Sequence, residues 1–318
     1  MLSEQLDELL KRRILILLGK GGVGKTTLAA AFATVAAERG LRTLAMECDL
    51  RAPLCALFGK EPAFEPQQVA PNLAAMVLEG RHSLGEYLHL VVPGGAVLNA
   101  VFASRLYQYF VNAAPGLKEL MMLGKICYES EQRNRDLIVF DAPASGQALG
   151  LLKMPFAARE TFGESVVGRE ARHIARTLRN EKTCAVVQVT IAEPLAIAET
   201  LEAHAGLDAL GLKVAAAILN RRNPAAFESS DIARLADHPA LKELAHLDYA
   251  CEAAQAELER AQASRRALAQ LRQTIRGPII ELDECRGYAG ADLVERLAAE
   301  LAGRLQDQPA RHASSAKD

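Results

Sequence analysis

Five features that would place this 318-residue chain in a special class are missing from it. No apolar run approaches the roughly 18 residues of a membrane span, and residues 1–13 are charged and amphipathic, without the apolar region of a secretory signal. No two of the six cysteines form a C-x-x-C pair, which excludes a zinc knuckle of that type, and the cysteine spacing does not fit a small disulfide scaffold. The formal charge of −2 gives no general attraction to nucleic acid. We therefore expect a soluble, cytoplasmic protein with reduced thiols, no direct membrane anchor and no nucleic-acid partner.

The composition that is present suits one large globular domain. Half of the residues are hydrophobic and 24% are charged, which is ordinary for a chain with a sizeable buried core. We expect residues 1–305 to form a single domain, with a helical subdomain made by insertions around 65–135 and 225–275. The polar tail, residues 306–318, is expected to be disordered.

The most specific pattern is a glycine-rich loop at residues 19–27. It fits G-x-x-x-x-G-K-[ST], and it lies between the apolar run 13–18 and the helical stretch 28–39. Polyphosphates are held by backbone N–H groups, and glycines let the chain wrap closely enough to present them. The pattern predicts a nucleotide-binding phosphate loop formed by Gly19, Lys20, Gly21, Gly22, Val23, Gly24, Lys25, Thr26 and Thr27.

The chemistry of such a loop gives two of its side chains definite roles. The Lys25 ammonium should reach the β- and γ-phosphates, and the Thr26 hydroxyl should ligate Mg²⁺. The N-terminus of the helix that follows adds a favourable dipole for the phosphates. ATP or ADP with Mg²⁺ is therefore the expected ligand.

Two aspartates follow apolar segments that read as strands. The strand predicted over 42–47 places Asp49 near its carboxyl end, where ligands bind in open α/β sheets. The run 137–140 ends in Asp141, the Walker B arrangement in which a carboxylate holds Mg²⁺, often through water. We expect Asp49 to face the γ-phosphate and the attacking water, and both acids to join Thr26 around Mg²⁺. The alternative for Asp49 is a helix N-cap.

With Lys20, the loop resembles the signature K-G-G-x-G-K-[ST] of the deviant Walker A ATPases. This group includes ArsA-type arsenite-pump ATPases, tail-anchored-protein targeting ATPases, MinD and ParA positioning proteins and nitrogenase iron protein. Residues 142–149 closely resemble the switch II segment of the ArsA and tail-anchor ATPases, and residues 151–155 continue it. The chain carries one such loop, so it resembles a single-repeat member of the ArsA and tail-anchor branch.

The resemblance implies Mg²⁺-dependent ATP hydrolysis by a homodimer, with catalytic roles for Asp49, Lys20 and Lys25. Lys20 would cross to the partner's nucleotide as an arginine finger does. Asp49 would be the switch I aspartate that positions or activates water, although the residues after it depart from the family's D-P-A-H form. Asn220 would read the adenine, with a simple turn as its alternative role. Gln147 stands where relatives commonly have histidine.

The implied fold is α/β, a doubly wound and mainly parallel sheet of P-loop NTPase type with an inserted α-helical subdomain. We expect residues 65–135 to be helices rather than another βα unit, with a capping box at Ser83–Glu86 and an apolar stripe within 97–110. An apolar, methionine-bearing insertion suits a groove for a hydrophobic client. Core packing or a dimer surface explains the same pattern.

Three biological roles fit these features. The first is a targeting ATPase whose dimer holds a hydrophobic protein client or acts with a membrane partner protein. The second is the energising subunit of an arsenite or antimonite efflux pump, for which thiolates should bind the metalloid. The third is a positioning switch of the ParA and MinD kind.

Overall fold

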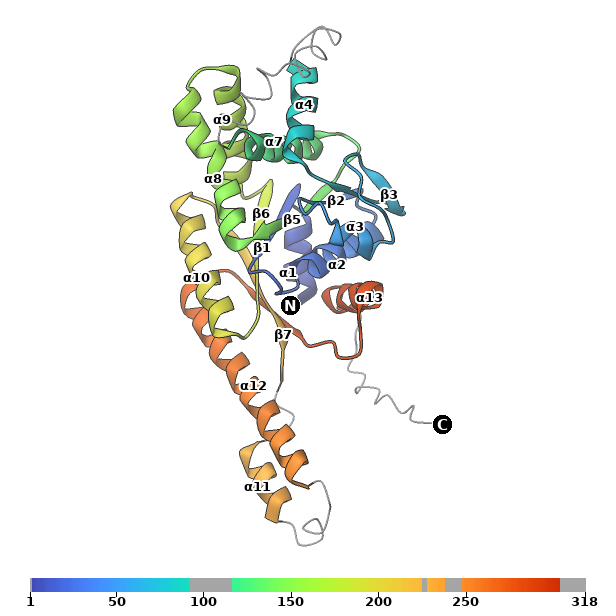
Figure 1. Cartoon of the computed structure of the whole chain (residues 1–318), viewed down its shortest axis with the longest axis vertical. Helices are drawn as coiled ribbons and strands as arrows, with labels where there is room; N and C mark the ends of the chain where they lie inside the picture. Colours follow the sequence, from blue (N-terminus) through green and yellow to red (C-terminus); the bar gives the residue numbers. More distant parts are fainter. Residues whose placement is uncertain (1, 92–115, 225–227, 238–246, 304–318) are drawn as a thin grey trace.

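The structure is a computed structural model that describes residues 2–91, 116–224, 228–237 and 247–303 (Figure 1). Its elements in chain order are α1 (Leu2–Leu10), β1 (Ile14–Gly19), α2 (Lys25–Glu38), β2 (Thr43–Glu47), α3 (Pro53–Leu57), β3 (Gln67–Ala70), β4 (Leu73–Val77), α4 (Gly80–Val91), α7 (Leu117–Glu131), β5 (Leu137–Ala144), α8 (Ser145–Phe162), α9 (Val166–Arg179), β6 (Cys184–Thr190), α10 (Pro194–Ala209), β7 (Val214–Arg222), α11 (Ser229–Asp237), α12 (Leu247–Thr274), β8 (Ile279–Asp283) and α13 (Gly290–Leu301).

The described strands form one eight-stranded sheet in the order β3-β4-β2-β5-β1-β6-β7-β8. Neighbouring strands are parallel throughout, except that β3 runs antiparallel to β4 at one edge. Helices cover both faces of the sheet, as parallel sheets require. The predicted doubly wound, mainly parallel fold is confirmed.

Side-chain alternation along the central strand separates two hydrophobic cores. Leu15 and Leu17 of β1 face the core made with α1, α2, α3 and α13. Ile14, Ile16 and Leu18 face the core made with α4, α7, α8 and α9. All five residues are fully buried, which is why this strand reads as a continuous apolar run in the sequence.

The helical expectation for residues 65–135 was wrong over its first part. Residues 67–77 form the antiparallel hairpin of β3 and β4, and β4 pairs with β2 in parallel register. The five residues of β4 are all buried, so the strand has no polar alternation to mark it, and alanine and methionine favour helix as readily as strand. Helices α4 and α7 do occupy the later part, while the predicted stripe within 97–110 lies outside the described residues.

The predicted capping box at Ser83–Glu86 was also wrong, because α4 begins three residues earlier, at Gly80. The backbone N–H of Ser83 donates to the carbonyl of Glu79, as within a helix. The Glu79 carboxylate accepts a hydrogen bond of 2.8 Å from the His82 N–H, so this acid stabilises the first turn.

The long helices expected within 225–275 are confirmed as α11 and α12. Figure 1 shows α11 and the N-terminal part of α12, which packs beside it, extending from one end of the molecule. Helices α4, α7 and α9 lie at the opposite end. The predicted disordered tail falls in residues 304–318, outside the described part of the chain.

An ion pair fastens the start of β5 to the start of β2. Oδ2 of Asp136 accepts hydrogen bonds from the Arg42 backbone N–H at 2.9 Å and from its Nε at 2.8 Å, and Oδ1 accepts from Nη2 at 2.7 Å. Hydrogen bonding to the Arg42 guanidinium lowers the pKa of Asp136 to about 2. A carboxyl with a lowered folded-state pKa stabilises the fold above its unfolded pKa of about 4, and this stabilisation is lost as the pH falls toward 2.

We expect Asp136→Asn to lower the melting temperature by about 2 to 4 °C at pH 7. The difference in melting temperature between variant and wild type should become smaller as the pH falls from about 4 toward 2, because Asp136 itself then becomes neutral. Thermal unfolding followed by circular dichroism at pH 7 and pH 3 checks this, with the exposed acid Glu61→Gln as control. If the difference in melting temperature is the same at both pH values, the loss of stability comes from packing and not from charge.

Candidate nucleotide-binding site

The phosphate loop joins β1 to α2, and two of its glycines are required by close approach. A Cβ on Gly19 would lie 2.1 Å from the carbonyl oxygen of Val189 on β6. Gly24, at the N-cap of α2, has φ of +93°, and its Cβ would meet the amide nitrogen of Asn220 at 2.5 Å. The predicted strand, loop and helix are confirmed, and the loop is seated against strands β6 and β7.

Asn220 is buried, with 5% of its surface exposed, and it fastens the loop. Its side-chain nitrogen donates a hydrogen bond of 2.8 Å to the Val23 carbonyl oxygen. The residue belongs to β7 and not to a simple turn. A contact with adenine stays a prediction for Asn220, and one of its amide hydrogens is already used within the protein.

Lys25 begins α2 and is 9% exposed. Its ammonium donates a hydrogen bond of 3.0 Å to the carbonyl oxygen of Lys20, which folds the side chain back over the loop. Burial lowers the pKa of Lys25, and the nearby Asp141 carboxylate opposes that shift. A lysine held over a ring of backbone N–H groups is well placed to bind phosphate oxygens.

Thr26 and Asp141 come together as the sequence predicts. The Thr26 hydroxyl donates a hydrogen bond of 2.6 Å to Oδ2 of Asp141. The other carboxylate oxygen, Oδ1, is buried without a hydrogen-bond partner. Burial raises the pKa of Asp141 to about 6, while the bond from Thr26 and the charge of Lys25 oppose the rise. A hydroxyl beside a buried carboxylate oxygen with no partner is a donor set that suits Mg²⁺.

Asp49 lies beyond the end of β2, and its carboxylate is held by a neighbour. Arg51 donates to it from Nη2 at 2.7 Å and from its backbone N–H at 3.0 Å. Hydrogen bonding to Arg51 lowers the pKa of Asp49, which makes the carboxylate a weaker base. Its side chain does not cap α3, so the alternative role as N-cap was wrong. Asp49 is better suited to orient water than to remove a proton from it.

The acid that does stabilise α3 is Glu47, which sequence reasoning missed. Its two carboxylate oxygens accept hydrogen bonds from the backbone N–H groups of Leu54 and Cys55, each at 2.9 Å. Glu47 is 1% exposed, and burial raises its pKa. A charged residue that ends an otherwise apolar strand was the signal that could have revealed it.

Residues from four segments of the chain line one cavity of about 680 Å³. The phosphate loop, the turn after β2, the end of β5 and the first turn of α8 contribute its walls. The walls include Gly21, Gly22, Lys25, Thr26, Glu47, Cys48, Asp49, Arg51, Asp141 and Gln147. The predicted catalytic and metal-binding residues other than Lys20 therefore share a single cavity.

Lys20 does not line this cavity. Its ammonium lies 3.7 Å from the Glu199 carboxylate on α10, and 26% of its side chain is exposed. The lysine thus points away from the phosphate loop of its own chain toward a surface formed with α10.

The family model for anion-transporting ATPases matches residues 12–171, half of the chain, and this span contains the phosphate loop, Asp49 and Asp141. The chain belongs to the anion-transporting ATPase family. This ATPase is 28% identical to ATPase BagA of Mycobacterium tuberculosis over 237 residues, which are 71% of this chain and 69% of the relative. It is 30% identical over 139 residues to the ATPase ASNA1 homolog 1 of Paramecium tetraurelia, covering 43% of this chain and 42% of that one. A Chlorobaculum tepidum protein, provisionally named an arsenical pump-driving ATPase, is 30% identical over 173 residues, or 52% and 41% of the two chains.

Family membership confirms the predicted ATPase and nucleotide-binding character of the chain. Within the part of this ATPase that the structure describes, no helix has the length and apolar character needed to span a membrane.

Proposed function

We propose that this ATPase is a Mg²⁺-dependent ATP hydrolase that works as a nucleotide-switched homodimer and carries or targets a hydrophobic protein client. The proposal joins three parts, each supported by a separate feature of the chain. The nucleotide cavity supports the hydrolysis, Lys20 supports the dimer, and a second cavity supports the client. The proposed role as a carrier of a hydrophobic client therefore depends on the second cavity.

The residues of the nucleotide cavity divide the chemistry of hydrolysis among them. The backbone N–H groups of the loop and the Lys25 ammonium bind and orient the phosphates. Thr26 and Asp141 would hold Mg²⁺, which supplies charge neutralisation at the phosphates when bound. Asp49, once separated from Arg51, would orient the attacking water together with Gln147, whose amide donates and accepts hydrogen bonds but does not titrate. Separation of Asp49 from Arg51 would accompany closure of the site.

The placement of Lys20 supports action between two copies of the chain. The Lys20 ammonium lies outside its own nucleotide cavity and pairs at 3.7 Å with the partly exposed Glu199. Such a weak pair leaves the ammonium available to a facing subunit. Lys20 would be released from Glu199 and inserted beside the partner's phosphates. There its ammonium would stabilise the negative charge of the transition state. Hydrolysis would then depend on dimer closure.

The second cavity supports the client and lies between α4, α7 and α9, with a volume of about 500 Å³. Its lining includes the apolar or aromatic side chains of Tyr87, Met121 and Tyr128. The charged or titratable residues that line it are Glu86, His89, Lys125, Glu131, Glu170 and His173. Met121 is 2% exposed and also belongs to the buried core, together with Leu117, Leu120 and Leu123 of α7. An aromatic and methionine-bearing cavity between helices suits an apolar helix of varied sequence.

The metalloid-pump alternative needs thiolates that lie together, and the structure does not favour it. Burial raises the pKa of Cys48, Cys55 and Cys184 to about 12, so these thiols stay protonated near neutral pH. Among the residues with described side chains, the one group of three or more possible metal ligands contains no cysteine. A positioning switch of the ParA and MinD kind is supported by no separate feature.

The client proposal is tested by binding of a labelled apolar helix of about 20 residues, the length of a membrane span. Binding is measured by fluorescence anisotropy with no nucleotide, with ADP and with ATP and Mg²⁺. We expect binding to tighten with ATP, and Tyr128→Ser to weaken it by about ten-fold, since a buried aromatic contact is worth about 1.4 kcal/mol or more.

Tyr249→Ser serves as the matched control, because Tyr249 is an exposed tyrosine on the distant helix α12. Equal binding by wild type and Tyr128→Ser would remove the cavity from the proposal. Absence of binding in every nucleotide state, together with ATPase stimulation by antimonite, would instead favour the pump subunit.

A further inference from the structure

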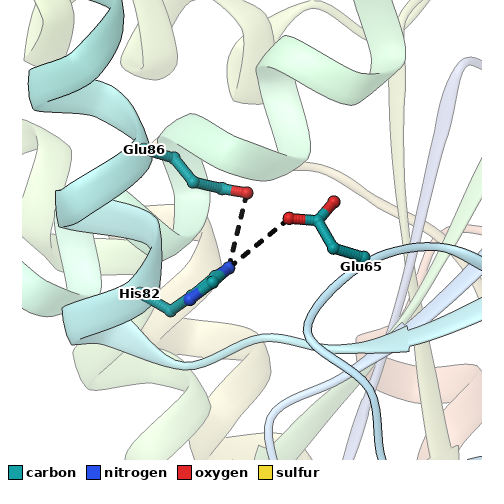
Figure 2. Close-up of side chains that lie close together, drawn as sticks. All are labelled: Glu65, His82 and Glu86. Carbon is teal, nitrogen blue, oxygen red and sulfur yellow. Dashed lines mark ion pairs between the residues drawn. The ribbon is translucent and has the colours of Figure 1, made fainter. Parts of the chain in front are cut away.

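A histidine and two glutamates converge at the base of α4, away from the nucleotide cavity. Figure 2 shows His82 and Glu86 projecting from α4 toward Glu65, which comes from the loop that precedes β3. The Nε2 atom of His82 lies 3.6 Å from one carboxylate oxygen of Glu65 and 3.6 Å from one of Glu86. The possible ligand atoms of the three residues lie within 4.8 Å of one another.

We propose that Glu65, His82 and Glu86 form a binding site for a divalent transition-metal ion, with Zn²⁺ as the ion that fits best. None of the three residues lines the nucleotide cavity, whereas Glu86 also lines the cavity proposed for the client. It would join the loop before the β3–β4 hairpin to the first two turns of α4.

The spacing of the donor atoms fits a metal better than a hydrogen bond. A contact of 3.6 Å is too long for a hydrogen bond, and the buried Nε2 atom of His82 makes none, although 39% of the side chain is exposed. In a tetrahedral zinc site with bonds of about 2.1 Å, neighbouring ligand atoms lie about 3.4 Å apart. An ion placed among the three atoms would therefore need only small side-chain adjustments.

The arrangement of the ligands follows from the local chain. His82 and Glu86 are four residues apart on α4, so they lie on the same face of the helix. Pro66 restricts the backbone of Glu65 to extended conformations, which limits the movement of the third ligand. Phe64 stacks on the His82 ring with centroids 5.1 Å apart and fixes its orientation.

The surrounding charges also suit a divalent cation. Lys125 holds Glu86 at 3.1 Å, and it is itself shared with Glu129 at 3.1 Å. Arg135 lies 3.7 Å from the carboxylate of Glu129. The carboxylates of Glu65, Glu86 and Glu129 carry one negative charge more than the two cations Lys125 and Arg135. Lys125 also orients Glu86 from outside the proposed coordination shell, as partners of metal ligands commonly do.

The donor set selects the class of metal. One imidazole nitrogen with two carboxylate oxygens suits Zn²⁺, whereas Mg²⁺ and Ca²⁺ prefer ligand sets made only of oxygen. Three protein ligands leave one tetrahedral position for water, which agrees with the 72% exposure of the Glu65 side chain.

The test uses the full-length protein, stripped with a chelator and then held in excess Mg²⁺. Zn²⁺ binding is measured by isothermal titration calorimetry, and Co²⁺ absorption spectra distinguish nitrogen and oxygen ligands from thiolates. We expect one Zn²⁺ per chain at this site, with His82→Ala and Glu65→Gln each weakening the affinity by at least about ten-fold. The spectrum of the bound Co²⁺ should show no thiolate ligand.

His173→Ala is the matched control, because the His173 side chain is also 39% exposed and its Nε2 atom lies 2.9 Å from the carboxylate of Glu131. It should bind Zn²⁺ as the wild type does. Glu65→Gln keeps the test valid if His82→Ala fails to fold, since Glu65 is mainly exposed. Equal affinities of Glu65→Gln and wild type, no binding at all, or a thiolate spectrum would each overturn the site.

Discussion

Lys25→Ala is expected to lower ATP turnover at least about 100-fold, the usual cost of losing a pre-positioned charge at a developing anion. The Lys25 ammonium is buried in the wall of the nucleotide cavity, 3.0 Å from the Lys20 carbonyl oxygen. Its loss would leave the phosphates without a charged donor from the loop and would deprive the Asp141 carboxylate of a neighbouring cation. ATP binding followed by calorimetry and phosphate release followed by a coupled assay measure the two effects.

The control for Lys25→Ala is Lys213→Ala, which removes an exposed lysine paired with Glu181. That variant should retain full turnover. Circular dichroism shows whether Lys25→Ala has kept the fold, which we expect because alanine favours helix at the first position of α2. Unchanged ATP turnover in a folded Lys25→Ala protein would refute the assignment of the site.

Lys20→Ala is expected to retain ATP binding and to lose hydrolysis by about 10³-fold or more, the range for a charge supplied across an interface. Lys20 does not line the cavity of its own chain, so its removal should leave the nucleotide affinity within a few-fold of the wild type. Single-turnover hydrolysis and equilibrium ATP binding separate the two quantities. Sedimentation in ATP and Mg²⁺ shows whether the dimer still forms.

Glu199→Gln distinguishes this role from a structural one. It breaks the same ion pair of 3.7 Å but leaves the lysine in place, so hydrolysis should persist or rise. If both variants lose hydrolysis equally, the pair itself is what matters, and the cross-subunit role of Lys20 would be wrong. A Lys20→Ala enzyme with normal turnover would contradict the role directly.

The parts of the site that were predictable are those encoded in short segments. The phosphate loop carries its glycines, lysines and threonines within nine residues, and Asp141 directly follows the continuous apolar run 137–140, so local pattern was sufficient. The pairing of Asp49 with Arg51 is also local, and an arginine two residues after a candidate catalytic acid was a visible signal.

Contacts between distant segments were not predictable in this way. The bond from Asn220 to Val23 joins residues 197 positions apart, and the sequence shows only that both lie near strand ends. Lys20 and Glu199 meet for the same reason, through the packing of α10 beside β1. The hairpin of β3 and β4 was missed because its strands have four and five residues, too few to show a period against the helical prediction for the surrounding segment.

The position of β1 in the sheet sets an order for the maturation of the enzyme during synthesis. This strand is made before both of its neighbours, β5 and β6, which come more than 100 residues later in the chain. The residue that fastens the phosphate loop, Asn220, comes later still. A nascent chain that ends at residue 171 would therefore contain the whole phosphate-loop motif. It would lack strand β6, which pairs with β1, and Asn220, which donates a hydrogen bond to the loop. The loop can therefore acquire its final shape only after β6 and β7 have been made.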